Sequence, residues 1–488
     1  GDYDVDGVTS TSLLMKVIGA LTDNVSYYIP SRLDEGYGLH RESIDKIHEA
    51  GGELIVTVDC GSVSREETEY AHSLGIETLV TDHHNVSDVR AEGIVINPRL
   101  PEDQYPFKGL AGVGVAYKLA LALSREREIP KEIMAELPEL VTVGTIADIM
   151  PVLGENRTII KFGMRFIHLG CKNPGLRRLI ELSGIDYRTM KSTDISFAIA
   201  PKINAAGRLG DAALGVKLFL SEDPGEIERY CTQLIEANQK RKSLQDEAYN
   251  AGLEMVDREL EQGDFIMLEI NDSHEGVLGI VAGKVREKIN RPVVVISKNG
   301  DNYKGTGRSI PTVNLFEMLD RYRSHFISFG GHAAACGFTL AAEKAEELKA
   351  NLNADLMAMK LEDEHIFDLN YHYDAEVEAR EVDLNLAETL ELLEPCGKDN
   401  EVPVALVRDV MVTDWHFLKN DTKYARFQLE SEDGYRIGCI LFRDALKFKD
   451  IVDTCDRVDV LGTIDVNRWN GTSRVQMTIS SILPAGEL

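Results

Sequence analysis

Acidic residues and histidines stand directly after two short apolar runs in the amino-terminal part of the sequence. The run at 54–58 ends on Asp59, and the run at 78–80 leads into the segment Thr-Asp-His-His at 81–84. In open α/β sheets with parallel strands, ligands bind beyond the carboxyl ends of the strands. A further apolar run lies at 94–96. The pattern predicts a doubly wound, mostly parallel α/β domain with functional side chains at one edge of its sheet.

Alternating carboxylates open the sequence at Asp2, Asp4 and Asp6, and Gly7 follows them. Side chains at alternate positions of an extended segment point to the same side, so these acids can share a hard cation. Gly7 would then allow a tight turn into a helix that begins near Thr9. A calcium loop or a solvated turn has a similar pattern, but this chain has Leu-Leu-Met where an EF-hand loop needs its downstream Glu.

A further acid, Asp148, follows the apolar segment 141–147. Taken singly, an acid at such a position is a helix cap, and a histidine is a hydrogen-bonded side chain of the core. Taken together, carboxylates and one or two imidazoles suit Mn²⁺ or Mg²⁺. A pair of such ions can hold both the attacking and the leaving oxygen of a phosphoryl displacement. The combination predicts a metal-dependent site for phosphate chemistry.

The same segments resemble the successive motifs of the DHH phosphoesterase superfamily, in similar order and spacing. The motifs are Gly-Asp-Tyr-Asp-Val-Asp-Gly at 1–7, Val-Asp-Cys-Gly at 58–61, Thr-Asp-His-His at 81–84 and Gly-Thr-Ile-Ala-Asp-Ile-Met-Pro at 144–151. The resemblance implies two bound ions, either Mn²⁺ or Mg²⁺. It implies metal ligands at Asp4, Asp6, Asp59, His83 and Asp148, with Asp2 as a further candidate.

Catalytic roles follow from the same resemblance for Asp59, His84 and Asp148. In related phosphoesterases the second histidine faces the substrate phosphate, so His84 is expected to contact phosphate or to act as an acid. The alternative is that His84 only orients a metal ligand through a hydrogen bond.

Apolar positions recur at helical spacing between 225 and 262 and stop at Gly263, which predicts a long connecting helix. The first domain is accordingly expected at 1–224, and a second α/β domain at 263–360.

Glycine-rich segments at 305–309 and 330–337 mark the second domain, and their backbone amides can approach phosphates closely. Together with His-Glu-Gly-Val-Leu-Gly-Ile at 274–280 they resemble the DHHA1 domain of the superfamily. The resemblance implies a substrate cleft between the two domains.

The remaining residues, 361–488, contain β-rich segments at 424–429, 436–441 and 475–479, which predict a small barrel of OB type. Segments 395–400 and 467–471 resemble the OB domain of the RecJ family. Such a barrel can stack bases on aromatic side chains within a cationic groove. The available residues are Trp415, Phe417, Tyr424, Trp469, Lys419, Lys423, Arg426, Arg468 and Arg474, although aromatic residues at strand spacing more often belong to the core.

Two more segments, at 29–38 and 201–209, resemble the RecJ family rather than shorter relatives. By this resemblance Arg32, Arg208 and Ser309 form a pocket for a 5′ phosphate. Arg32 could instead pair with a neighbouring acid on the surface. The further predicted substrate contacts are Asn204, Arg308, Gly330, Gly331 and His332.

The formal net charge of −28 opposes binding of a phosphate backbone. Carboxylates that hold divalent cations do not repel substrate once metal is present, and a basic groove can be local. The seven cysteines include no Cys-x-x-Cys pair, which argues against zinc. No apolar run suits a membrane span and no leader is visible, so a cytoplasmic location is expected. The abrupt start suggests that the first domain lacks its amino-terminal segment.

The resemblance to the RecJ family implies a 5′→3′ exonuclease for single-stranded DNA that releases 5′-mononucleotides and acts in DNA repair and recombination. A helicase and a single-strand-binding protein are expected partners. One alternative is a phosphodiesterase of short oligoribonucleotides or cyclic dinucleotides, although a dinucleotide needs no OB barrel. Another is a non-catalytic scaffold in a replication complex, although the expected acids and histidines are all present.

Overall fold

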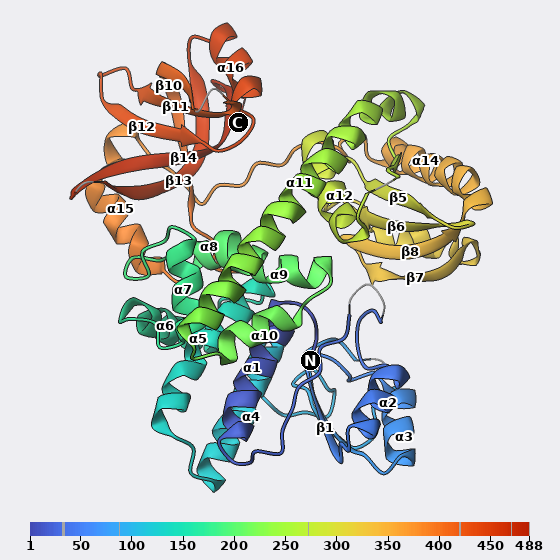
Figure 1. Cartoon of the computed structure of the whole chain (residues 1–488). Coiled ribbons are helices and arrows are strands. Elements are labelled where there is room, and N and C mark those ends of the chain that lie inside the picture. The colour runs from blue at the N-terminus through green and yellow to red at the C-terminus, as the bar shows by residue number, and fades with distance from the viewer. Residues whose placement is uncertain (32–34, 87, 272, 419–420, 470, 488) are drawn as a thin grey trace.

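The structure is a computed structural model that describes residues 1–31, 35–86, 88–271, 273–418, 421–469 and 471–487. These residues form three β-sheets in successive parts of the chain, and a long helix leads from the first part to the second (Figure 1). Within the described ranges, no helix combines the length and the apolar character that a membrane crossing requires.

The first sheet has three parallel strands in the order β1 (Leu54–Val58), β2 (Glu77–Thr81) and β3 (Ile94–Ile96). All three strands occupy the segments where apolar runs predicted them, so the expected parallel α/β domain is confirmed. The helices of this part are α1 (Val5–Gly19), α2 (Arg41–Glu49), α3 (Arg65–Ser73), α4 (Gly112–Glu126), α5 (Lys131–Ala147), α6 (Gly154–His168), α7 (Pro174–Leu182), α8 (Ser192–Asp194), the π-helix η1 (Ile195–Ile199), α9 (Ala200–Leu209) and α10 (Ala213–Leu220).

Helix α1 begins earlier than the sequence predicted, at Val5 rather than near Thr9. The reason is that Asp4 caps the helix, since its Oδ1 accepts a hydrogen bond of 3.1 Å from the Gly7 amide. Asp6 therefore lies in the first helical turn, so the prediction of an extended acidic segment is wrong for Asp6, whereas Asp4 has extended backbone. Gly7 serves close packing, because a Cβ there would lie 2.3 Å from the carbonyl oxygen of Asp2.

Helix α11 (Pro224–Gln262) has 39 residues and occupies the segment predicted as the connecting helix. Its amino-terminal part packs into the core of the first region through Ile227, Cys231 and Leu234. Its carboxyl-terminal part packs against the second sheet through Ala248 and Val256. The helix thus belongs to two hydrophobic cores. Figure 1 shows its course from the first region to the second.

The second sheet is mixed, with strand order β4-β5-β6-β8-β7 and only the β4–β5 pair parallel. Helix α12 covers it beside α11, and α14 packs into a separate core. The elements are β4 (Ile266–Glu269), α12 (Glu275–Ile289), β5 (Val293–Asn299), β6 (Asn302–Arg308), α13 (Leu315–Asp320), η2 (Arg323–His325), β7 (Phe326–His332), β8 (Ala335–Ala341), η3 (Ala342–Lys344) and α14 (Ala345–Glu362).

The carboxyl-terminal strands close into a five-stranded barrel, because β10 pairs with both β11 and β13 while β12 pairs with β14. This closure confirms the predicted barrel of OB type. Its elements are β9 (Ala375–Glu376), η4 (Ala379–Glu381), α15 (Leu384–Leu390), η5 (Glu391–Leu393), β10 (Val404–Leu418), β11 (Asp421–Glu430), β12 (Arg436–Leu441), α16 (Ala445–Thr454), β13 (Val458–Trp469) and β14 (Thr472–Pro484). The predicted domain boundaries at 224, 262 and 360 stay predictions.

Candidate metal centre

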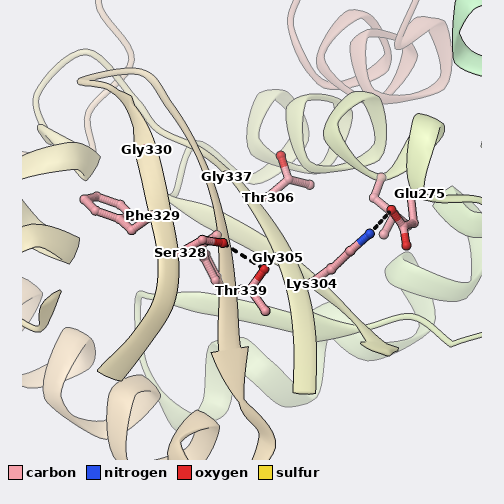
Figure 2. Close-up of a pocket in the computed structure, with 11 residues that line it drawn as sticks. Glu275, Lys304, Gly305, Thr306, Ser328, Phe329, Gly330, Gly337 and Thr339 are labelled. Atoms are coloured by element: carbon pink, nitrogen blue, oxygen red, sulfur yellow. Dashed lines mark hydrogen bonds and ion pairs between the residues drawn. The ribbon is translucent and has the colours of Figure 1, made fainter. Parts of the chain in front are cut away.

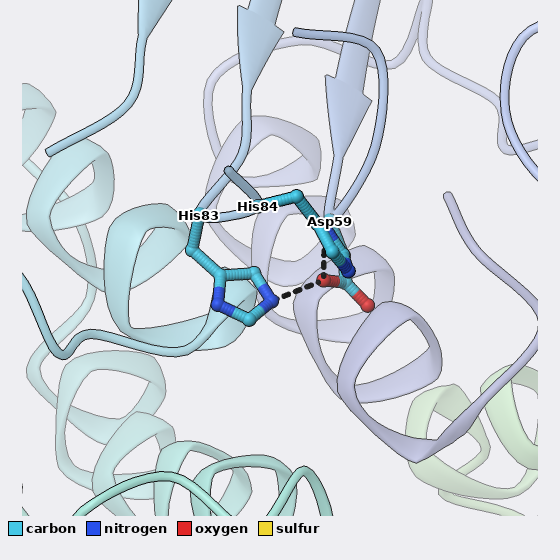
Figure 3. Close-up of side chains that lie close together, drawn as sticks. All are labelled: Asp59, His83 and His84. Carbon is cyan, nitrogen blue, oxygen red and sulfur yellow. Dashed lines mark ion pairs between the residues drawn. The ribbon is translucent and has the colours of Figure 1, made fainter. Parts of the chain in front are cut away.

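Asp59 and His83 meet at the carboxyl edge of the first sheet, directly after β1 and β2. Asp59 has a left-handed φ of 61°, a conformation that Asp tolerates better than most residues. Its amide still donates to the carbonyl oxygen of Thr81, which ties the two strand ends together. His83 Nε2 lies 3.0 Å from Asp59 Oδ1, and Figure 3 shows the two side chains pointing toward one another.

Two more acids face the same imidazole. His83 Nε2 lies 3.5 Å from Asp148 Oδ2, at the end of α5, and 3.7 Å from Asp6 Oδ2, in the first turn of α1. The ligand atoms of Asp6, His83 and Asp148 all lie within 4.8 Å of one another. Segments that are far apart in the sequence thus bring three carboxylates and one imidazole to a single point.

The start of α4 holds Asp6 in place. Its Oδ2 accepts 2.6 Å from the Gly112 amide, and its Oδ1 accepts 2.8 Å from the Val113 amide. Free amides at a helix amino terminus favour a carboxylate in this position. A Cβ on Gly112 would lie 2.7 Å from Asp59 Oδ1, so this helix approaches the acids only because it begins with glycine.

A second group consists of Asp2, Asp4 and Asp59, whose ligand oxygens also lie within 4.8 Å of one another. Asp59 belongs to both this group and the group of Asp59, His83 and His84. It therefore stands between two sets of possible ligands. This arrangement suits a pair of cations with one shared carboxylate.

Burial and mutual repulsion make these acids hard to ionise without a cation. Burial, together with the charge of Asp4, raises the pKa of Asp2 and of Asp6 to about 7. Burial and the charge of Asp6 raise the pKa of Asp148 to about 8 and that of Asp59 well above its usual range. A divalent cation would reverse this preference.

Unpartnered buried atoms support the same conclusion. Asp2 Oδ1, Asp59 Oδ1 and both ring nitrogens of His83 make no hydrogen bond although they are buried. Burial and the nearby charge of His84 lower the pKa of His83 to about 3, so its ring is neutral and can offer a lone pair. Buried polar atoms normally have partners, and a metal ion would supply them here. The residues present therefore fit Mn²⁺ or Mg²⁺.

His84 has a different environment from His83. Its Nδ1 lies 2.8 Å from Asp82 Oδ1 and 3.0 Å from the hydroxyl of Tyr37. Burial works to lower the pKa of His84, but the hydrogen bond and charge of Asp82 outweigh it and raise the pKa. The side chain is 46% exposed, so this imidazole faces the solvent beside the acids.

Asn204, a predicted substrate contact, instead supports the segment that carries Asp2, Asp4 and Asp6. Its Oδ1 accepts 3.2 Å from the Val5 amide at the start of α1. In the same helix, a Cβ on Gly207 would lie 2.6 Å from the carbonyl oxygen of Tyr3. Helix α9 therefore packs directly against the segment that carries Asp2, Asp4 and Asp6.

Arg208 and Arg308 come together at the start of α12. Arg208 Nη1 donates 3.0 Å to the carbonyl oxygen of Gly276, which joins the first region to the second. Arg308 Nη1 donates 2.7 Å to the Gly307 carbonyl, and its Nη2 would lie 2.9 Å from a Cβ on Gly279. Arg32, the third predicted arginine, lies outside the described residues.

The hydroxyl of Ser309 is already hydrogen-bonded within its own loop. It is buried, and its Oγ donates 2.7 Å to the Val313 carbonyl within its own loop. Gly331 has a φ of 151°, and a Cβ there would lie 2.4 Å from the Ala335 carbonyl, so the β7–β8 hairpin needs glycine. His332 is exposed at the end of this hairpin.

Gly330 lines an open groove of about 370 Å³ over β6, β8 and β7 (Figure 2). Phe329 forms part of its wall, and Lys304 pairs with Glu275 at 2.9 Å on the side of α12. An aromatic ring beside a cation suits stacking and charge pairing with a nucleotide.

On the barrel, Trp415 stacks on the buried ring of Phe427 with centroids 4.8 Å apart, and Phe417 is 37% exposed. The side chain of Trp469, and all of Lys419, lie outside the described residues. Arg468 pairs with Glu391 at 2.6 Å, so this predicted nucleic-acid contact is held by an acid of its own chain.

Sequence reasoning assigned no role to four residues that shape the site. They are Gly112 and Val113, through their amides, and Tyr37 and Asp82, through their side chains. The glycine-rich stretch at 109–114 was a visible signal for a close approach. Tyr37 lies in the segment 29–38, yet nothing in its spacing linked it to His84.

Models of known protein families match three parts of the chain. The family model described as DHH family, N-terminal domain, matches residues 1–145. The DHHA1 domain model matches residues 262–358, and the RecJ OB domain model matches residues 373–481.

Among curated proteins, the single-stranded-DNA-specific exonuclease RecJ of Salmonella typhimurium is 34% identical, over 99% of this chain and 86% of the relative. The protein of the same name from Bacillus subtilis is 33% identical, over 98% of this chain and 60% of its own length. The chain thus spans less than two thirds of the Bacillus relative.

Solved structures lead to the same family. The crystal structure of RecJ from Thermus thermophilus in complex with Mn²⁺ matches with a TM-score of 0.82 at 28% identity, over 100% of this chain and 69% of that one. A crystal structure of exonuclease RecJ bound to manganese matches with a TM-score of 0.65 at 33% identity, over 76% of this chain and 92% of that one. With DHH, DHHA1 and OB domains in this order and a relative matched along most of its length, the chain belongs to the RecJ family.

Proposed function

We propose that this chain is a metal-dependent 5′→3′ exonuclease for single-stranded DNA that releases 5′-mononucleotides. The observation that carries the proposal is the cluster of buried carboxylates around His83, with buried oxygens and nitrogens that lack hydrogen bonds. Membership of the RecJ family supports the choice of substrate, because its relatives are named single-stranded-DNA-specific exonucleases.

Two cations would be held by this cluster. Asp6, His83 and Asp148 would hold one, Asp2 and Asp4 the other, and Asp59 would contact both. When bound, Mn²⁺ or Mg²⁺ supplies charge neutralisation for the phosphate and lowers the pKa of a water molecule.

Hydrolysis forms one bond from a water oxygen to phosphorus and breaks the bond from phosphorus to O3′ of the terminal nucleotide. The O3′ atom leaves with a proton, and the shortened strand keeps the phosphate at its new 5′ end. His84 is the group suited to donate a hydrogen bond to the reacting phosphate. Asp82 fixes its Nδ1, which leaves Nε2 for the substrate.

Selection of a 5′ end is assigned to the two arginines at the start of α12. A helix amino terminus and guanidinium groups both favour a phosphate. Arg208 donates to the Gly276 carbonyl there, and Arg308 Nη2 lies against Gly279 of the same helix. The same proposal includes Arg32. Ser309, Gly330, Gly331 and His332 stay candidate contacts for the strand.

The groove beside Phe329 and the barrel with Trp415 would hold successive nucleotides of an unpaired strand. Action on single strands fits a role in DNA repair and recombination, with a helicase and a single-strand-binding protein as partners and a cytoplasmic location.

The test is digestion of single strands labelled at either end, with and without a 5′ phosphate, in the presence of Mn²⁺. We expect mononucleotides from the 5′ end and no activity in Asp59→Ala. Equal digestion of duplex ends would contradict the preference for single strands. Turnover limited to dinucleotides would indicate a phosphodiesterase of short oligonucleotides instead. A protein that folds and binds metal but has no activity would indicate a non-catalytic scaffold.

A further inference from the structure

Two neighbouring residues at the start of α6, Asn156 and Arg157, each bind backbone carbonyls in loops outside their own helix. Asn156 is buried, with 1% of its surface exposed. Its Nδ2 donates 2.6 Å to the carbonyl oxygen of Gly109 and 3.0 Å to that of Pro151. One amide group therefore joins two loops that are remote in the sequence.

Both loops support proposed metal ligands. Pro151 lies in the loop that follows Asp148. Gly109 lies in the loop that leads to Gly112, whose amide donates 2.6 Å to Asp6 and whose Cα approaches Asp59 closely. Asn156 touches no ligand itself, yet it fixes the loops on both sides of the metal centre.

Arg157 binds a segment that leads to the barrel. Its Nη1 donates 2.7 Å to the Pro395 carbonyl, and its Nη2 donates 2.8 Å to the Leu393 carbonyl. We call residues 393–398 the docking segment, since they lie between α15 and the first long barrel strand, β10. Ser192 holds the same segment, because its Oγ donates 2.6 Å to the Cys396 carbonyl.

The docking segment also contacts the loop after Asp148 directly. The Val152 amide donates 2.7 Å to the Lys398 carbonyl. A Cβ on Gly397 would lie 2.6 Å from Val152 Cγ2, so the contact is close enough to require glycine. The docking segment, which leads into the barrel, and the metal centre thus share one loop, 148–153.

We propose that Asn156 is a positioning residue for the metal centre and that Arg157 couples the seating of the barrel to the same centre. The inference rests on the proposed function, since it treats Asp6 and Asp148 as metal ligands. When the docking segment that leads into the barrel is seated on Arg157 and Val152, loop 148–153 is held and Asp148 faces Asp6. When Arg157 is lost, the loop is released and the ligands of one cation move apart.

The first experiment compares Mn²⁺ binding by titration calorimetry in the full chain and in Asn156→Asp. This change keeps the shape of the side chain but removes both N–H donors and sets a carboxylate against two carbonyls. We expect the Kd for Mn²⁺ to rise about tenfold or more, since partners behind metal ligands commonly contribute 10- to 100-fold. Excess Mn²⁺ should restore kcat without a change in KM, which it should not do in Asp148→Ala.

The second experiment tests the coupling with Arg157→Lys, Arg157→Ala and the control Arg165→Ala, an exposed position of the same helix. We expect weaker Mn²⁺ binding and faster hydrogen exchange of the amides at 148–150 and 152 in Arg157→Ala, a smaller effect in Arg157→Lys, and none in Arg165→Ala. Circular dichroism identifies variants that fold, and Arg157→Lys keeps the test open if the other variants do not fold.

Unchanged Mn²⁺ affinity in folded Asn156→Asp would overturn the positioning role. A loss in Asn156→Asp with none in Arg157→Ala would overturn the coupling. Mn²⁺ affinity and hydrogen exchange, on which both outcomes depend, are measured without substrate and stand apart from nuclease activity. Failure of the parent chain to digest DNA would count against the proposed function alone.

Discussion

His83 Nε2 lies 3.0 Å from Asp59 Oδ1, although neither atom makes a hydrogen bond. A neutral imidazole and a buried carboxylate that approach each other without a shared hydrogen bond are arranged for a third partner. Buried acids repel one another across this point, so a metal-free centre costs stability and a bound cation recovers it.

Stability of the metal-free protein should fall as the pH rises from about 4 to about 8. In an unfolded chain Asp titrates near pH 3.9, roughly. In the folded chain the pKa of Asp6 is raised to about 7 and that of Asp148 to about 8 by burial and by neighbouring acids. The folded state therefore binds more protons in this window, and the free energy of unfolding decreases as they are lost. Denaturant unfolding with EDTA at several pH values measures this.

Saturating Mn²⁺ should remove most of that pH dependence, and Asp148→Asn should reduce it in the metal-free protein. Repulsion from the high net charge acts on both variants alike, so their difference isolates the site. A metal-free protein that is as stable at pH 8 as at pH 5 would contradict the buried-acid account.

Gly112→Ala should abolish tight Mn²⁺ binding. The added Cβ would lie 2.7 Å from Asp59 Oδ1, and the helix that holds Asp6 must then move away. We expect a loss of affinity of about 100-fold, the upper range for disturbed supports of metal ligands. Calorimetry with Mn²⁺ measures it.

The matched control is Gly114→Ala in the same helix, where the new Cβ meets only the side chain of Leu110 at 3.2 Å. Both changes alter helix propensity alike. Equal Mn²⁺ affinity in the two variants would show that the approach of α4 to Asp59 is not critical.

The sequence predicted the site correctly where a single polar side chain follows a single apolar strand. The apolar runs before Asp59 and His83 gave both strand and site, because parallel strands end at a common edge. The start of α1, which carries Asp6, was predicted too late in the chain. The same residues fit both an extended acidic segment and a helix that is capped by Asp4. Contacts such as Gly112 with Asp6, or Asn156 with Gly109, join loops far apart in the chain, and single-sequence spacing carries no record of them.

Asp82→Asn should weaken catalysis without removing metal ligands. Asp82 holds Nδ1 of His84 at 2.8 Å. Burial alone would lower the pKa of His84, but the hydrogen bond and charge of Asp82 outweigh burial and raise this pKa. Without that charge the pKa of His84 falls, so the alkaline limb of kcat should shift to lower pH. A fall in kcat of about 10- to 100-fold is expected.

Tyr37→Phe serves as control, because it removes the other contact of Nδ1, at 3.0 Å, and keeps the carboxylate. Its pH profile should stay near that of the parent, while His84→Gln should lose the limb. An unshifted profile in Asp82→Asn would exclude His84 as the titrating group.

Arg208→Lys should reduce the preference for a phosphorylated 5′ end. The change keeps the charge but loses the fork of donors that now reaches Gly276 at the start of α12. Hydrogen bonds to charged groups contribute about 1.5–3 kcal/mol, so the ratio of KM for 5′-hydroxyl and 5′-phosphate strands should shrink by about tenfold or more. Mn²⁺ affinity should not change, because Arg208 belongs to none of the three groups of candidate ligands. Kinetics on both strands, with Arg165→Ala as control, measure the ratio. An equal loss of activity on 5′-hydroxyl and 5′-phosphate strands would show that Arg208 only holds the two domains together and that the terminal phosphate binds elsewhere.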